Sequence, residues 1–111
     1  ALGTVKALKG KVGYMNFVTR VSPDCDCFPW SDHPIVPDVG ILASKDPVAI
    51  DRASYDLVND QMGFQGTKLK GGYEKGEDKF QAMRPKVNAK LQFSYGEEIG
   101  LGSADYELIK I

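Results

Sequence analysis

Residues 39–51, VGILASKDPVAID, hold an apolar run that leads directly into the start of a helix. Residues 39–43 are apolar or glycine without interruption, which predicts a strand that is buried on both faces. Asp46 suits the N-cap position of a helix, because its carboxylate can accept hydrogen bonds from the first free backbone N–H groups. Pro47 suits the first helical position, where no N–H group is needed.

The helix that starts at Pro47 is expected to run to about Met62, because Gly63 is a natural stop. Apolar residues recur in it at spacings of three and four, so one face of the helix should pack on the core. The residues on that face are Ile50, Ala53 and Leu57.

Further elements are expected on both sides of this strand and helix. They are a helix in residues 1–8, a strand within residues 12–21, a helical region in residues 77–99 that is interrupted near Pro85, and a last strand in residues 106–111. A proline-rich loop, residues 22–37, and a glycine-rich loop, residues 64–76, lie between them. The pattern predicts a single α/β domain over residues 1–111, with a small mostly parallel or mixed sheet flanked by helices.

Length and composition are those of a soluble globular protein. The 111 residues are 42% hydrophobic and 26% charged, with a formal net charge of -1, so nothing directs the chain toward nucleic acid or an anionic membrane. No apolar run approaches the roughly 20 residues that span a bilayer. Two cysteines are too few for a disulfide framework, and reduced thiols in the cytoplasm are expected.

The chain starts in the middle of its first predicted element. The helix in residues 1–8 has no N-cap residue and no initiator Met, which suggests a fragment of a larger α/β domain. Such a fragment should leave uncovered an apolar face or sheet edge. We therefore expect the chain to self-associate, most simply as a two-fold homodimer, with the contact near residues 39–43 or 106–111.

The densest chemistry lies in the proline-rich loop, where residues 25–33 read CDCFPWSDH. This segment holds both cysteines, the only histidine and the only tryptophan of the chain. Cys25 and Cys27 could place two sulfurs on one side of an extended backbone, where two thiolates can clamp one soft metal ion. A tetrahedral site needs two more ligands, from His33 with an aspartate or from a partner chain. The alternative is a pair of reduced, partly buried thiols that pack as small apolar side chains.

Polar residues next to this loop and at the helix start are further candidates. In parallel α/β sheets, ligands collect where strands end and helices begin, and both segments are expected at such positions. Asp46 has a sufficient structural explanation as an N-cap, and Asp51 can complement the helix dipole or bond to neighbours. The candidates of this group are Asp24, Asp38, Ser44, Asp46 and Asp51.

Several stretches of the chain resemble a known protein family. They are residues 13–17, GYMNF, residues 22–27, SPDCDC, residues 34–51, PIVPDVGILASKDPVAID, and the ending 100–108, GLGSADYEL. The family is the uncharacterised one numbered 362 among domains of unknown function, found in ferredoxin-type iron–sulfur proteins, and the chain resembles its C-terminal part. The resemblance implies a parent protein that handles iron–sulfur clusters in electron transfer, with ferredoxin-like four-cysteine motifs upstream as partner region. Of the family's cysteines, only the element Cys25-Asp26-Cys27 lies in this chain.

Three functions remain open. The first is a metal- or cluster-associated domain of a ferredoxin-type protein, with Cys25 and Cys27 as first-choice ligands. The second is an enzyme domain in which cysteines and aspartates line a pocket for a small anionic substrate. The third is a purely structural α/β half-domain that completes the fold of its parent. One copy of this chain cannot by itself complete a four-cysteine iron–sulfur cluster.

Overall fold

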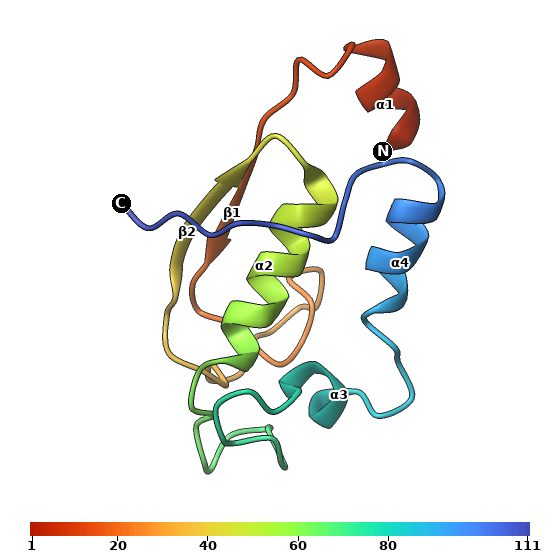
Figure 1. Cartoon of the computed structure of the whole chain (residues 1–111). Coiled ribbons are helices and arrows are strands. Elements are labelled where there is room, and N and C mark those ends of the chain that lie inside the picture. Colours follow the sequence, from red (N-terminus) through yellow and green to blue (C-terminus); the bar gives the residue numbers. More distant parts are fainter. The chain divides into compact units, whose positions relative to one another are not determined.

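A computed structural model describes all residues from 1 to 111. Helices and strands are both present, so the fold is mixed α/β as expected (Figure 1). In chain order the elements are α1 (Leu2–Ala7), β1 (Tyr14–Val18), β2 (Gly40–Ser44), α2 (Pro47–Asn59), α3 (Lys79–Met83) and α4 (Leu91–Glu98). None of these helices has the length and apolar character needed to cross a membrane.

β1 and β2 form a two-stranded antiparallel sheet, not the mostly parallel or mixed sheet that was expected (Figure 1). The connection between them, residues 19–39, contains no helix, and parallel neighbours need a long crossover connection that is usually helical. The pairing extends beyond the strand ends, because Val39 N donates to Val18 O at 2.9 Å. The sequence pattern suggested parallel strands because a helix follows β2, but that helix does not lead to a third strand.

Burial alternates along β2. Leu42 and Ser44 are partly covered, whereas Ile41 and Ala43 are exposed. The prediction that residues 39–43 are buried on both faces is therefore wrong. In this small sheet every second side chain points away from α2, the helix that lies against the other face (Figure 1).

The predicted last strand, residues 106–111, is not formed. These residues have no regular secondary structure and are exposed. They run beside β2 and the first turns of α2, and together the three segments line a groove of about 330 Å³. A strand needs a hydrogen-bonded neighbour, and no part of the chain pairs with this segment as a sheet neighbour.

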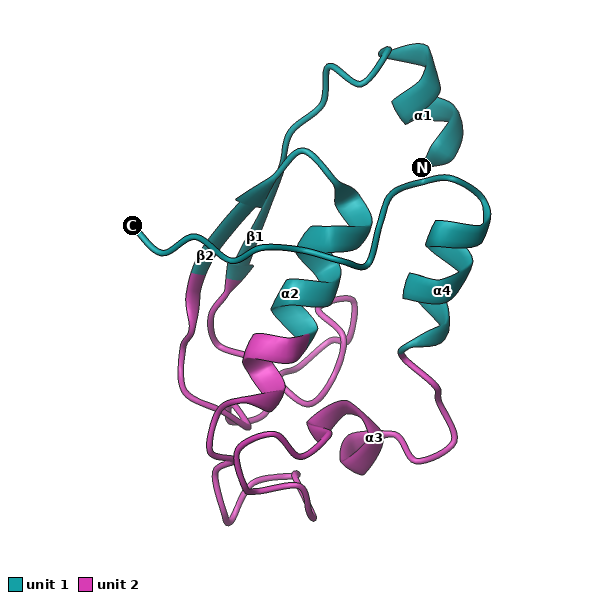
Figure 2. Cartoon of the chain, viewed as in Figure 1, with its two compact units in different colours: residues 1–17, 41–55, 90–111 teal, residues 18–40, 56–89 magenta.

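The chain divides into two compact units, which Figure 2 shows in different colours. Unit 1 comprises residues 1–17, 41–55 and 90–111, and unit 2 comprises residues 18–40 and 56–89. Each unit has its own buried apolar residues. In unit 1 these are Val48, Ala49, Ile50, Ala53, Tyr55 and Phe93, and in unit 2 they are Val18, Ile35, Val36, Val58 and Leu69.

Helix α2 begins as the sequence predicted. Asp46 Oδ1 accepts hydrogen bonds from the backbone N–H groups of Val48, at 2.8 Å, and Ala49, at 3.0 Å, so Asp46 is the N-cap and Pro47 is the first helical residue. On the predicted core face, Ile50 and Ala53 are buried, as expected, and Leu57 is only partly buried.

Helix α2 ends at Asn59, earlier than the predicted end near Met62. The reason lies in the next loop of unit 2. Asn59 O accepts from Gly76 N at 2.8 Å and from Lys79 Nζ at 2.9 Å, so this carbonyl has partners outside the helix. Gly63 N in turn donates to Tyr73 O at 2.7 Å. Hydrogen bonds to residues outside the helix therefore take the place of the last helical turn that the sequence predicted.

The region in residues 77–99 is divided into α3 and α4, with Pro85 between them, as predicted. Asp78 caps α3, because its side chain accepts from Gln81 N at 2.9 Å. Helix α4 packs within unit 1 through Phe93, whose ring meets that of Tyr55 edge to face at 5.5 Å.

Candidate functional site

The two thiols lie at the tip of the long connection between β1 and β2, within unit 2. Cys25 Sγ and Cys27 Sγ are 3.0 Å apart, and both residues are exposed. A turn brings them together, since Phe28 N donates to Cys25 O at 2.9 Å. The backbone is thus turned here, not extended as the sequence pattern suggested.

The two thiols share a hydrogen bond, and this bond separates their acidities. Cys27 Sγ donates to Cys25 Sγ, which lowers the pKa of Cys25 because the bond stabilises its thiolate. The same contact raises the pKa of Cys27, since losing its proton would break the bond and place a second negative charge beside Cys25. Cys25 is therefore the more acidic of the two thiols, and a metal ion that replaces the shared proton would relieve the repulsion between two thiolates.

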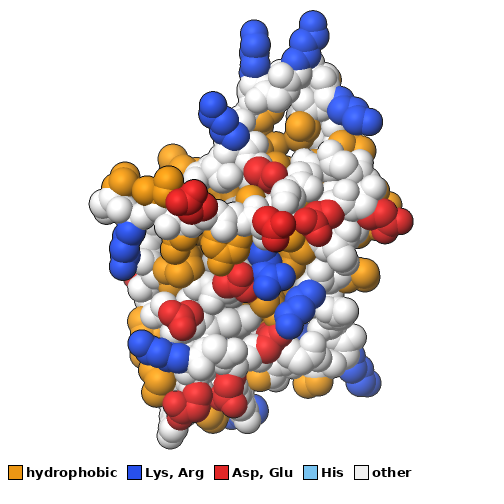
Figure 3. Space-filling view, in the orientation of Figure 1, with side chains coloured by type: hydrophobic (Ala, Val, Ile, Leu, Met, Phe, Trp, Pro, Cys, Tyr) orange, Lys and Arg blue, Asp and Glu red, His pale blue; other side chains and the backbone are white.

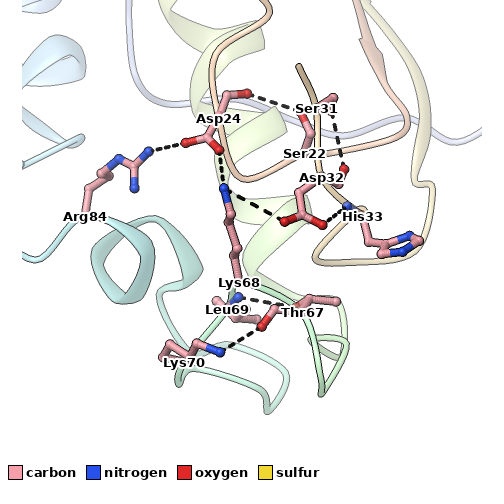
Figure 4. Close-up of polar contacts among 10 residues, drawn as sticks. All are labelled: Ser22, Asp24, Ser31, Asp32, His33, Thr67, Lys68, Leu69, Lys70 and Arg84. Carbon is pink, nitrogen blue, oxygen red and sulfur yellow. Dashed lines mark hydrogen bonds and ion pairs between the residues drawn. The ribbon is translucent and has the colours of Figure 1, made fainter. Parts of the chain in front are cut away.

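Asp24, directly before Cys25, anchors the loop and is not free to act as a metal ligand (Figure 4). Its carboxylate lies between Lys68 Nζ, at 2.9 Å, and Arg84 Nη2, at 2.6 Å, and its side chain is only 13% exposed. Hydrogen bonds from these two cations lower the pKa of Asp24. Asp24 therefore ties the base of the cysteine turn to the glycine-rich loop and to the end of α3.

His33 is exposed and does not join the two thiols. Its backbone N donates to Asp32 Oδ1 at 2.7 Å, and its ring points away from the ion pairs in Figure 4. No group of three or more His, Cys, Asp or Glu side chains in the chain is arranged to hold a metal ion. The chain therefore brings together two of the three suggested ligands, Cys25 and Cys27, and leaves His33 apart.

The other suggested site residues all have structural partners. In unit 2, Asp38 Oδ1 accepts from Arg20 N at 2.6 Å. In unit 1, Ser44 Oγ accepts from Asp46 N at 3.0 Å, and Asp51 Oδ1 accepts from Asn16 Nδ2 at 2.9 Å. Asp46 is the helix cap described above.

Sequence reasoning missed the cations that hold the cysteine loop. Lys68 lies in the glycine-rich loop and Arg84 at the end of α3, and neither is among the residues that the sequence suggested for the site. Their partner Asp24 lies 44 and 60 residues earlier in the chain, so no local pattern signals the contact. Ion pairs between such distant segments follow only from the fold of unit 2.

A second feature that the sequence did not reveal is a small cavity in unit 2, of about 150 Å³. Its wall is mostly apolar and includes Ile35, Val58 and Met83, with Ser22 and Arg84 as polar members. The fully buried Lys79 contributes to the same wall, but its ammonium group is occupied by the backbone carbonyls of Asn59, Glu74 and Glu77. The cavity is thus a gap beside the Asp24 anchor, without a free charged group from Lys79.

Comparison with known proteins gives one match. Residues 4–56, just under half of the chain, match the family model described as "Domain of unknown function (DUF362)". This stretch contains β1, the cysteine turn, β2 and the first turns of α2, and the match supports the resemblance noted from the sequence. No curated protein and no solved structure matches the chain.

Proposed function

We propose that this chain is a metal-associated domain in which Cys25 and Cys27 supply two thiolate ligands to a soft metal centre. The observation that carries the proposal is the pair of exposed sulfurs, 3.0 Å apart on an anchored turn. Thiolates are the ligands that zinc, Cu(I) and iron–sulfur clusters prefer. Held by Asp24, the turn presents both sulfurs to solvent without needing to refold.

The donor geometry fits one metal ion with a small adjustment. Two thiolates bound at about 2.3 Å to one tetrahedral ion stand roughly 3.8 Å apart. The sulfurs of Cys25 and Cys27 are closer than that, at 3.0 Å, and have to separate by rotation of their side chains. Because both residues are exposed, no packed neighbour has to move out of their way.

We also propose that a longer protein of ferredoxin type is the natural context of the pair. The resemblance to a family found in such proteins supports this step. Cys25 and Cys27 would hold one side of an iron–sulfur cluster, whose own chemistry is one-electron transfer, and further cysteines upstream would hold the other side. The donor set fits only in part, since this chain offers two of the four thiolates that such a cluster needs.

The enzyme reading has weaker support. In that hypothesis Asp46 or Asp51 would line the pocket together with a cysteine. Both carboxylates accept hydrogen bonds that hold unit 1 together. Asp24 is likewise engaged by two cations. A catalytic role would therefore have to come from Cys25 without the help of these acids.

Cobalt titration under anaerobic conditions tests the proposal. We expect Co²⁺ to give strong thiolate-to-cobalt absorption with the wild-type chain and none with the double variant Cys25→Ser/Cys27→Ser. Ser31→Ala, in the same exposed loop, is the matched control and should bind as the wild type does. Equal uptake by the double variant would show that the thiols are not the ligands. No uptake by the wild type would favour the structural half-domain.

A further inference from the structure

The cysteine turn is the start of an exposed apolar tip. Phe28 and Trp30 follow Cys27 directly, and their rings meet edge to face with centroids 4.9 Å apart. Trp30 is 63% exposed, and Phe28 is exposed as well. Large aromatic side chains that stay in solvent beside two thiols are typical of a contact surface, where aromatic residues are enriched. We call residues 25–30 the cysteine tip.

Ligand number is the second observation. A tetrahedral thiophilic ion needs four ligands, and one copy of the chain offers two sulfurs with no third ligand gathered beside them. The carboxylate of Asp24, the residue directly before Cys25, is already held by Lys68 and Arg84. One chain alone would leave half of the coordination shell to water, which is a poor ligand for a soft ion.

We infer that one thiophilic divalent ion, such as Zn²⁺, joins two copies of this chain through Cys25 and Cys27 of each copy. The inference rests on the proposed function and adds a partner to it. A two-fold axis through the ion gives both copies the same role, so two sulfurs from each complete a four-thiolate site. Each cysteine that still carries its thiol proton releases it to solvent when its thiolate binds the ion.

The aromatic residues of the cysteine tip supply the rest of the contact. With the ion on the axis and the four sulfurs around it, Phe28 and Trp30 of one copy lie close to the same residues of the other. They can then bury apolar surface that is exposed in the single chain. Asp26, between the two cysteines, works against the complex, because it adds a negative charge beside the four thiolates.

Sedimentation during a zinc titration of the 111-residue chain tests the inference, starting from metal-free, reduced protein. At a protein concentration at which the metal-free chain is a monomer, we expect conversion to a dimer with one zinc per two chains, reversed by a chelator. The fluorescence of Trp30, the only tryptophan, should change along the same titration, because it lies within the contact. Cys25→Ser/Cys27→Ser should abolish the zinc-dependent dimer.

Two further variants separate the metal site from the contact around it. Phe28→Ser/Trp30→Ser should still bind zinc but weaken dimerisation by about tenfold or more, which corresponds to about 1.4 kcal/mol. Asp26→Asn should strengthen dimerisation, most clearly at low salt. Unchanged dimerisation in the aromatic double variant would overturn the contact that we describe.

The outcomes distinguish this inference from the proposed function. Zinc uptake at one ion per chain, with the chain remaining a monomer, would overturn the dimer and leave the metal-associated domain standing. Absence of zinc and cobalt uptake would overturn both. A zinc-dependent dimer that persists in Cys25→Ser/Cys27→Ser would overturn the inference, because other residues would then hold the ion.

Discussion

Both carboxylate oxygens of Asp46 accept backbone hydrogen bonds within unit 1. Oδ1 caps α2 through Val48 N and Ala49 N, and Oδ2 accepts from Ser103 N at 2.8 Å. Gly102 lies so close that a methyl group on it would overlap the carboxylate. Asp46 therefore ties the start of α2 to the chain segment after α4, a role beyond that of an N-cap.

This double role changes what Asn should do at position 46. From the capping role alone, Asp46→Asn would be nearly neutral and Asp46→Ala would cost about 1 kcal/mol. Asn has one acceptor oxygen, so its amide N–H₂ would face Ser103 N or a helix N–H. We expect Asp46→Asn to be destabilised as well, by about 1 kcal/mol.

Urea denaturation of Asp46→Asn and Asp46→Ala measures the effect. Asp51→Asn is the control, because the hydrogen bond that its side chain accepts from Asn16 Nδ2 needs only one acceptor oxygen. Wild-type stability of Asp46→Asn would show that the bond to Ser103 contributes nothing.

Lys79 is fully buried, and its ammonium group donates to the carbonyls of Asn59, Glu74 and Glu77 at 2.9, 2.9 and 3.2 Å. Burial lowers the pKa of Lys79, because the charged form loses hydration. Lys79→Met should lower the free energy of unfolding by about 1–3 kcal/mol, since buried carbonyls lose their donor. Lys75→Met, at an exposed position in the glycine-rich loop before α3, should have little effect in the same denaturation experiment.

Asp24 gives the folded chain a dependence on acid pH. Its pKa is lowered in the fold, so its ion pairs stabilise the chain at pH values above the ordinary carboxyl range. This contribution should be lost as the pH falls through the lowered pKa. In acid titrations followed by circular dichroism, the stability difference between wild type and Asp24→Asn should therefore shrink toward low pH. A constant difference would show that the carboxylate charge is not what anchors the loop.

At the scale of elements, α4 packs against α2 within unit 1. Gly96 lets α4 approach, because a methyl group there would lie 2.8 Å from Val48 Cγ2. Phe93 is buried against Tyr55, and the guanidinium of Arg52 lies 5.7 Å from the centre of its ring. Of the residues of α4 only Phe93 and Gly96 are buried, so Phe93 is the buried apolar side chain of this helix.

Phe93→Ala should therefore cost about 3–5 kcal/mol, the range for removing a buried aromatic ring. Tyr95→Ala is the matched control on the same helix, since Phe93 is 2% exposed and Tyr95 is 57% exposed. Thermal unfolding of the two variants compares them directly. Similar melting temperatures would mean that α4 does not depend on this contact.

Local signals were enough for elements that begin or break at a particular residue. The pair Asp46-Pro47 predicted the start of α2, and Pro85 predicted the break between α3 and α4. Strand direction and the end of α2 could not be predicted in this way. They depend on partners that are distant in sequence, such as Val18 for Val39 and Lys79 for Asn59.

On the scale of the whole molecule, the surface mixes charges of both signs with apolar side chains on the face that Figure 3 shows. The outer face of the sheet adds large exposed side chains, Met15 and Phe17 from β1 and Ile41 from β2. Both strands also keep a free edge, because the sheet has only two strands. These features maintain the expectation of self-association near residues 39–43.

Sedimentation in the presence of a chelator tests this expectation separately from any metal effect. We expect association to increase with protein concentration and Phe17→Lys to reduce it, because a charge is placed in the exposed apolar face. Phe28→Lys, in the cysteine tip, should leave it unchanged under these conditions. A wild-type monomer over a hundredfold range of concentration would contradict the prediction.

The sequence by itself determined the elements and groups that depend on neighbouring residues. These include the mixed α/β class, the Asp46 cap, and the two thiols in one short proline-rich loop. Only the tertiary structure decided that the sheet is antiparallel, that residues 106–111 form no strand, and that Asp24 anchors the thiols instead of joining them. The physical reason is the separation along the sequence of the residues that interact. Caps and turns arise from bonds between residues a few positions apart. Sheet pairing, ion pairs and burial join segments that lie tens of residues apart, and the sequence pattern does not specify which segments will meet.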